Sequence, residues 1–174
     1  MKRFLIICAL LICGAGLRAQ DAKVASGHSI SASIVGFEYG YEHAMGDNWS
    51  MIFRAGLPPV LSSYIRYTDS NGQANVTAQF NAMPALTVEP RLYTTLNRRE
   101  RLGKSTVNNS SDFLSLRTIV YTSDFGSYYI TAIPMYGFRR GSEHWFREYT
   151  LGAAFHTIKP GFLPHFNFRI GYSF

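Results

Sequence analysis

Eight charged residues sit at alternating positions in runs that otherwise carry apolar side chains. Within each run the charged residues share one parity with other polar residues and oppose an apolar set. Charges that are shielded from water must be paired, and carboxylates match guanidiniums in hydrogen-bonding geometry. We therefore predict one network of ion pairs on a shared polar face, formed by Glu38, Glu42, Arg54, Glu89, Arg91, Arg117, Glu148 and Arg169.

The five histidines are the residues that invite a catalytic or metal-binding interpretation: His28, His43, His144, His156 and His165. No two of them are four residues apart, and there is no His-Glu-x-x-His cluster, so the sequence predicts no metal site and no cofactor. His156 with Thr157 and Glu148 suggests a lipid-modifying enzyme that acts by hydrolysis or acyl transfer. Adjacent strand residues face opposite sides, which separates His156 from Thr157. We predict no catalytic residues and no enzyme activity, and we keep lipid A modification as an alternative.

The segment "LGKST" ends like a phosphate-binding loop. That motif requires a glycine five positions before Gly103, where this sequence has Arg98, and no strand leads into a helix here. The segment from Asn97 to Asp112 is instead predicted to be a basic loop on the periplasmic side. Contact with an acidic partner or a lipid phosphate is the functional alternative for its four basic residues, Arg98, Arg99, Arg101 and Lys104.

The elements that position these residues are β-strands, because apolar residues recur at every second position. The last strand shows the pattern most clearly, with apolar side chains at Phe166, Phe168, Ile170, Tyr172 and Phe174. A C-terminal Phe that closes such a strand resembles the signal by which the outer-membrane assembly machinery recognises its substrates. We interpret these five residues as a C-terminal assembly signal.

The distribution of residue types over the two faces indicates the environment. One face collects the charges and the other collects aromatic residues near strand ends, as in transmembrane barrels with a polar interior. A soluble β-sandwich is the alternative. The sequence predicts an all-β, antiparallel, up-and-down transmembrane barrel of about eight strands. Its interior is just wide enough for side chains to fill, although the charged face would also suit a narrow conduit or small diffusion pore.

The amino terminus reads "MKRFLIICALLICGAGLRAQ" and has the basic start, short apolar run and small residues of a secretory signal peptide. We predict cleavage after Ala19, which makes residues 1–19 the signal peptide and residues 20–174 the barrel domain. A lipoprotein leader acylated at Cys13 is the alternative. After cleavage no cysteine remains, and 14 basic and 11 acidic residues leave a net charge of +3. Export and this low charge disfavour nucleic-acid binding.

The number of strands is the least certain part of the pattern. Seven strands are clear, and they begin near Ser29, Trp49, Ala74, Phe113, Ser127, Trp145 and His165. A barrel whose termini both face the periplasm needs an even number. A change of phase between Ile34 and Gly36 marks either a bulge or a break that supplies the eighth strand. Pro58 and Pro59 interrupt the long second strand in a similar way.

One segment resembles a known family. A strand with Glu-Pro-Arg and a following aromatic residue leads through a basic turn into a Gly-Lys-x-Thr-x-Asn-Asn-Ser loop. The residues are Glu89, Pro90, Arg91, Tyr93, Gly103, Lys104, Thr106, Asn108, Asn109 and Ser110. This pattern resembles small outer-membrane β-barrel proteins of Gram-negative bacteria, most of which have no assigned activity. The resemblance implies a fold and a compartment, and it carries over no catalytic residue.

The sequence thus predicts a small, porin-like but side-chain-filled barrel in the cell outer membrane, with a structural or interaction role. Its predicted partners are outer-membrane lipid, lipopolysaccharide and, during biogenesis, the barrel assembly machinery. The sequence leaves the oligomeric state and the ligand undetermined.

Overall fold

The computed structural model describes residues 24–34, 36–57, 59–67, 74–82, 84–122, 128–156 and 162–174. For residues 59–67 and 74–82, and for Thr122, His156 and Phe162, it describes the backbone only. The predicted signal peptide lies outside these ranges. The elements are β1 (Gly27–Ser33), β2 (Gly36–Ala44), β3 (Trp49–Leu57), β4 (Pro59–Tyr67), β5 (Ala74–Ala82), β6 (Ala85–Tyr93), α2 (Leu96–Arg101), the 3-10 turn η1 (Val107–Asn109), β7 (Asp112–Thr122), β8 (Tyr128–Gly141), β9 (Trp145–His156) and β10 (Phe162–Ser173).

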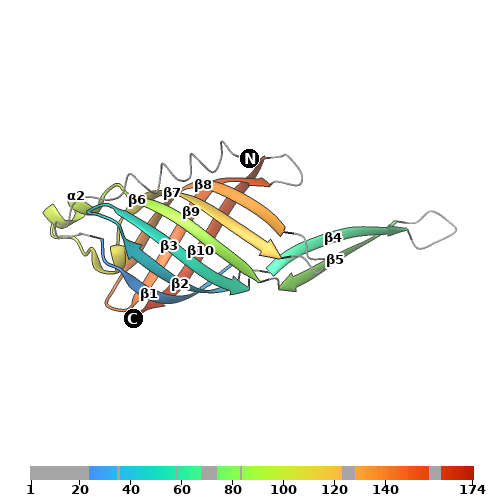
Figure 1. Ribbon diagram of the computed structural model, residues 1–174, viewed down its shortest axis with the longest axis horizontal. Helices are drawn as coiled ribbons and strands as arrows, with labels where there is room; N and C mark the ends of the chain where they lie inside the picture. Colours follow the sequence, from blue (N-terminus) through green and yellow to red (C-terminus); the bar gives the residue numbers. More distant parts are fainter. Residues whose placement is uncertain are drawn as a thin grey trace.

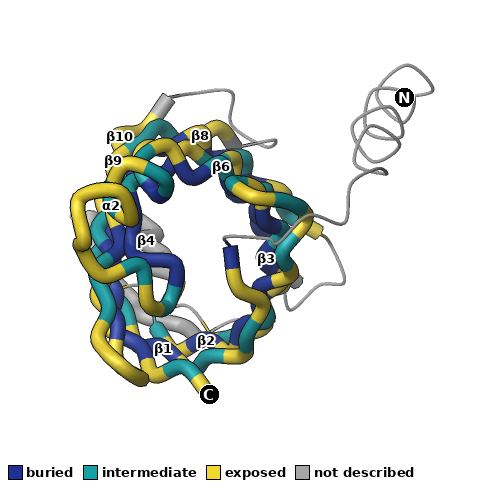
Figure 2. Tube along the Cα trace, turned by 90° about the vertical axis from the view of Figure 1, so that its left-hand side faces the viewer, coloured by how far each residue is buried: buried dark blue, intermediate teal, exposed yellow. Residues whose placement is uncertain are grey.

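Eight of these strands form a closed antiparallel barrel in the order β1-β10-β9-β8-β7-β6-β3-β2, and β2 returns to pair with β1. The seam joins the first and last strands, where Ser29 lies opposite Ser173. Figure 2 looks into the ring that results. Closure pairs the edges that an open sheet would leave exposed. The fold class predicted from the alternating pattern is confirmed.

The remaining two strands, β4 and β5, pair only with each other. They continue from β3 and lead into β6, and their hairpin extends away from one end of the barrel (Figure 1). We call this end the hairpin end. The opposite end, where β10 finishes and where α2 lies, is the C-terminal end.

The predicted number of barrel strands is correct, but one predicted strand is misplaced. The change of phase near Ile34 is a break, and β2 starts at Gly36 with a φ of 106° that favours glycine. The strand expected near Ala74 belongs to the hairpin, and the barrel strand in this region starts at Ala85. Residues 74–93 alternate almost continuously, so the sequence alone does not reveal where the chain re-enters the barrel.

The basic segment expected to be a loop contains most of a short helix, α2, so that prediction is wrong for residues 97–101. The helix is anchored by Leu96, which is buried against Val24, Tyr93 and Phe113. The arginine side chains of this helix are exposed to solvent or half-exposed. Within the described ranges, no helix has the length and apolar character needed to cross a bilayer.

Candidate functional site

The interior of the barrel carries most of its charge. All eight residues predicted to form ion pairs lie on inward-facing positions and are buried, with Glu89 and Arg91 at 0% exposure. Each comes from a barrel strand on which its neighbours point outward. The structure therefore brings together every member of the predicted set.

Glu89 is the first centre of this network. Its carboxylate accepts hydrogen bonds from three arginines on three neighbouring strands, at 2.5 Å from Arg54 Nη1, 2.5 Å from Arg91 Nη2 and 3.0 Å from Arg117 Nε. These residues lie on β3, β6 and β7. One carboxylate thus links three adjacent strands across their inner face.

Glu148 on β9 is the second centre. It lies 2.8 Å from Arg91 Nη1, 2.6 Å from Arg169 Nη1 and 2.9 Å from Arg139 Nη2. Two further carboxylates complete the network, because Arg169 Nη2 reaches Glu38 at 2.7 Å and Arg139 Nη1 reaches Glu42 at 2.9 Å. Arg91 joins the two centres, so the ion pairs form one connected system.

Arg139 is the member that sequence analysis missed. It lies in a segment with apolar residues on both parities, which leaves the inward face of that strand undecided. The strand register supplies the missing signal, because Arg139 pairs directly with Glu148 on the adjacent strand. Opposite charges on directly paired residues of one face favour each other.

The buried charges do not balance. Five buried arginines face four buried glutamates among the described residues, which leaves one positive charge in excess. Buried charge is costly unless it is paired and hydrogen-bonded. Two guanidinium nitrogens, Nη2 of Arg117 and Nε of Arg169, have no hydrogen-bond partner in the described structure.

Aromatic side chains fill the lumen at the C-terminal end. The guanidinium carbon of Arg91 lies 3.7 Å from the centre of the Phe113 ring, and that of Arg139 lies 4.5 Å from the centre of the Phe146 ring. Tyr93 packs edge-on against Phe113 and donates a hydrogen bond of 2.5 Å to Glu42. Cations stacked on aromatic faces gain electrostatic stabilisation. This half of the lumen is therefore both charged and densely packed.

The Asn-Asn-Ser sequence in the 94–111 segment has a structural role at this end. Asn108 and Asn109 adopt left-handed φ angles of 54° and 55°, which asparagine tolerates. Asn109 accepts a hydrogen bond from the Ala25 amide and donates one to its carbonyl. Asn108 donates to the carbonyl of Ser142 in the β8–β9 turn. The motif thus ties the segment just before β1 and a neighbouring turn to the C-terminal end.

With this geometry established, comparison with known proteins finds no matching family model, no matching curated protein and no matching solved structure. The family resemblance therefore stays a prediction, and the function has to be argued from the barrel itself.

The outer surface of the barrel is apolar. Large hydrophobic side chains are exposed around the ring, for example Phe37 at 72%, Leu86 at 64% and Leu151 at 64%. By strand alternation, Asp112, Arg140 and Arg147 are the charged residues on outward positions of the described barrel strands. All three lie at the C-terminal end, where Arg140 pairs with Asp112 at 2.7 Å. The polarity of a soluble protein is inverted here.

Aromatic rings gather on the outer surface at the C-terminal end. Tyr172 stacks on His144 and meets Trp145 edge-on, with ring centres 5.2 and 5.3 Å apart. His28 stacks on Phe174 and is hydrogen-bonded to Tyr39 at 2.7 Å. These histidines are thus members of an aromatic belt. Among the residues whose side chains are described, no three His, Cys, Asp or Glu groups converge as a metal site.

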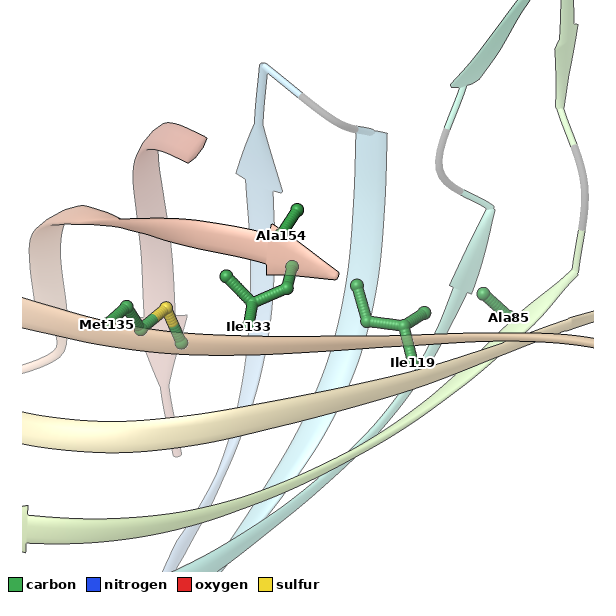
Figure 3. Close-up of a cluster of buried hydrophobic side chains, with 5 residues drawn as sticks. All are labelled: Ala85, Ile119, Ile133, Met135 and Ala154. Carbon is green, nitrogen blue, oxygen red and sulfur yellow. The ribbon is translucent and has the colours of Figure 1, made fainter. Parts of the chain in front are cut away.

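The lumen at the hairpin end is lined differently. Figure 3 shows Ala85, Ile119, Ile133, Met135 and Ala154, which form a buried apolar cluster on β6, β7, β8 and β9. Beside four of these residues lies a cavity of about 230 Å³, and Arg117 and His165 also line it. The predicted strand residue His165 therefore faces an internal cavity, while the side chain of His156 lies outside the described residues.

Proposed function

We propose that this chain is a small integral protein of the Gram-negative outer membrane, with a closed lumen and a structural or interaction role. The observation that carries the proposal is the inverted polarity of the barrel. Its charges are paired inside, and large apolar residues are exposed outside. A monomeric soluble protein rarely exposes a continuous apolar surface, whereas a barrel in lipid requires one.

The dimensions of the barrel support this proposal. Seven of the eight barrel strands have 9 to 14 residues, and β1 has 7. A tilted strand needs about 9 to 11 residues to cross a bilayer. The aromatic belt at the C-terminal end matches the girdle that such barrels place at the membrane interface. Phe166, Ile170 and Phe174 of the proposed assembly signal are exposed on the outer surface.

The filled lumen argues against a diffusion pore. Arg117, Glu148 and Arg169 are each only 1% exposed. The ion pairs Arg91–Glu148 and Arg139–Glu42 cross the lumen between strands that are not neighbours in the ring. An ion would have to break several buried ion pairs to pass. We therefore expect no stepwise conductance when the purified protein is added to a planar bilayer, and steps of defined size would contradict the closed lumen.

Location is tested in cells. The chain, expressed with its own leader in a Gram-negative host, should fractionate with the outer membrane. It should also migrate faster on a gel when unboiled than when boiled, because a folded barrel resists detergent. A tagged soluble periplasmic protein serves as the control for fractionation. Recovery in the soluble periplasm without a gel shift would refute the proposal.

A further inference from the structure

The cavity at the hairpin end differs from the rest of the lumen. Many of its lining residues are small or apolar, among them Ala85, Ile119, Ile133 and Ala154, and the hydroxyl-bearing residues Thr87, Tyr121 and Thr131 also line it. Its charged boundary is formed by Arg117 and Glu38 of the ion-pair network. It extends to Leu163, an inward position near the start of β10 that is 56% exposed. At the hairpin end, the cavity thus has charged residues on one side and mostly apolar residues on the other.

Two buried polar atoms on residues that line this cavity have no partner in the described structure. They are Nη2 of Arg117, whose residue is 1% exposed, and Nε2 of His165. A buried guanidinium donor without an acceptor is costly, and native proteins rarely keep one. His165 adds a second donor in the tautomer that carries its proton on Nε2. Both groups suit the same acceptor, an oxyanion.

The charge of the network favours an anion over water. Water molecules satisfy hydrogen-bond donors, but they do not compensate the positive charge that remains when five buried arginines meet four buried glutamates. A monoanion would neutralise the lumen and accept from Arg117, while an apolar body would fill the remaining space.

We propose that the cavity at the hairpin end binds a small amphipathic monoanion, with its carboxylate at Arg117 and His165 and its apolar part against Ile119, Ile133 and Ala154. The volume of about 230 Å³ limits the ligand to a short acyl chain or a single ring. Larger ligand pockets span about 300 to 1,000 Å³, and an apolar cavity of about 150 Å³ accepts benzene.

The test uses the full barrel in phospholipid nanodiscs, titrated with octanoate labelled with ¹³C at its carboxylate. We expect saturable binding of one octanoate per barrel, above the partitioning seen in empty nanodiscs. Octylamine and 1-octanol should bind at least about tenfold more weakly, because neither carries a carboxylate to which Arg117 can donate. Octanoate signals identical to those of empty nanodiscs would overturn the proposal, and so would equal binding of 1-octanol.

Two variants locate the site. Arg117→Gln should weaken octanoate binding at least about tenfold. The matched variant Arg54→Gln should weaken it by a smaller factor, because it removes the same excess charge but no contact with the carboxylate. Arg54 belongs to the same network and carries the same charge, but it does not line the cavity. Equal losses in both variants would refute a carboxylate contact at Arg117. Ala154→Phe, which fills the cavity without changing charge, should abolish binding while the barrel keeps its gel shift.

These outcomes are independent of where the protein resides in cells, because reconstitution needs only a closed barrel. If an arginine variant does not fold, the comparison of octanoate with octylamine in the unmodified protein and the Ala154→Phe variant still decide the question.

Discussion

The two halves of the lumen share one barrel wall but differ in how they are filled. At the C-terminal end, three aromatic rings pack against arginines and are almost fully buried. They belong to Tyr93, Phe113 and Phe146. At the hairpin end, the corresponding inward positions carry small residues such as Gly56, Ala85 and Ala154, and a cavity remains. A ring of eight strands fixes the radius at both ends. Side-chain size, and not strand number, therefore decides whether a section of the barrel is solid or hollow.

The largest effect is expected when the carboxylate at the first centre of the ion-pair network is removed. Glu89→Gln leaves Arg54, Arg91 and Arg117 without their shared carboxylate. Breaking a buried ion pair by removing one partner costs about 3–5 kcal/mol, so we expect a loss of this size in the free energy of unfolding. Urea titration of the barrel in vesicles, followed by the gel shift, measures it. Glu143→Gln, in the exposed turn after β8, is the matched control, and an equal loss there would show that charge alone matters.

A smaller effect is expected from adding one methyl group to the filled half. A Cβ atom on Gly137 would collide with the Phe113 ring and with Thr150. Overpacking of a tight interior costs about 1–3 kcal/mol, so Gly137→Ala should lower the free energy of unfolding by this amount. The double variant Gly137→Ala with Phe113→Leu should recover part of it. An unchanged urea midpoint for the single variant would mean that the C-terminal end is not tightly packed.

Enlarging a side chain beside the cavity at the hairpin end should instead raise the free energy of unfolding. Ala85→Val adds two methyl groups beside the cavity, and cavity filling commonly adds about 0.5–2 kcal/mol of stability. We expect a raised urea midpoint. If both halves lose stability on enlargement, the distinction between them fails. Ala55→Val, on the outward parity of β3, provides a control for strand propensity.

The smallest effect is expected from removing the β4–β5 hairpin. Its strands pair only with each other, and Gly56 already lies opposite Ala85 in the barrel. Replacing residues 58–83 with an Asn-Gly turn shortens the loop, and loop length changes closure entropy only slowly, so the free energy of unfolding should change by less than about 1 kcal/mol. Loss of the gel shift would show that the hairpin supports the barrel.

The sequence was sufficient to predict the strands of the barrel and which of their side chains face inward. Alternation assigns Glu38, Glu89 and Arg169 to the inner face without any knowledge of pairing, because the side-chain period of a strand is fixed. It was not sufficient for β8, whose two faces are both largely apolar, so Arg139 was not predicted to join the network. Only the register with β9 places it opposite Glu148.

The cavity was not predictable for a different reason. Ala85, Ile119 and Ala154 lie on three strands, and each looks like an ordinary alternating residue in its own run. Whether small residues from separate strands fall at one height depends on strand stagger, which a single sequence does not encode locally. The helix α2 was also missed, since its stability comes from the packing of Leu96 and not from a long amphipathic pattern.

The ion pair between Arg169 and Glu38 joins residues 131 positions apart, from the last strand to the second. The two residues can pair only when β10 lies next to β1, because that contact closes the ring. Until then the inner face of an open sheet presents guanidiniums and carboxylates that still lack partners, and hydrocarbon strongly disfavours such a surface. For the membrane location proposed above, lipid would therefore accommodate the closed cylinder far better than an open sheet whose charges still lack partners.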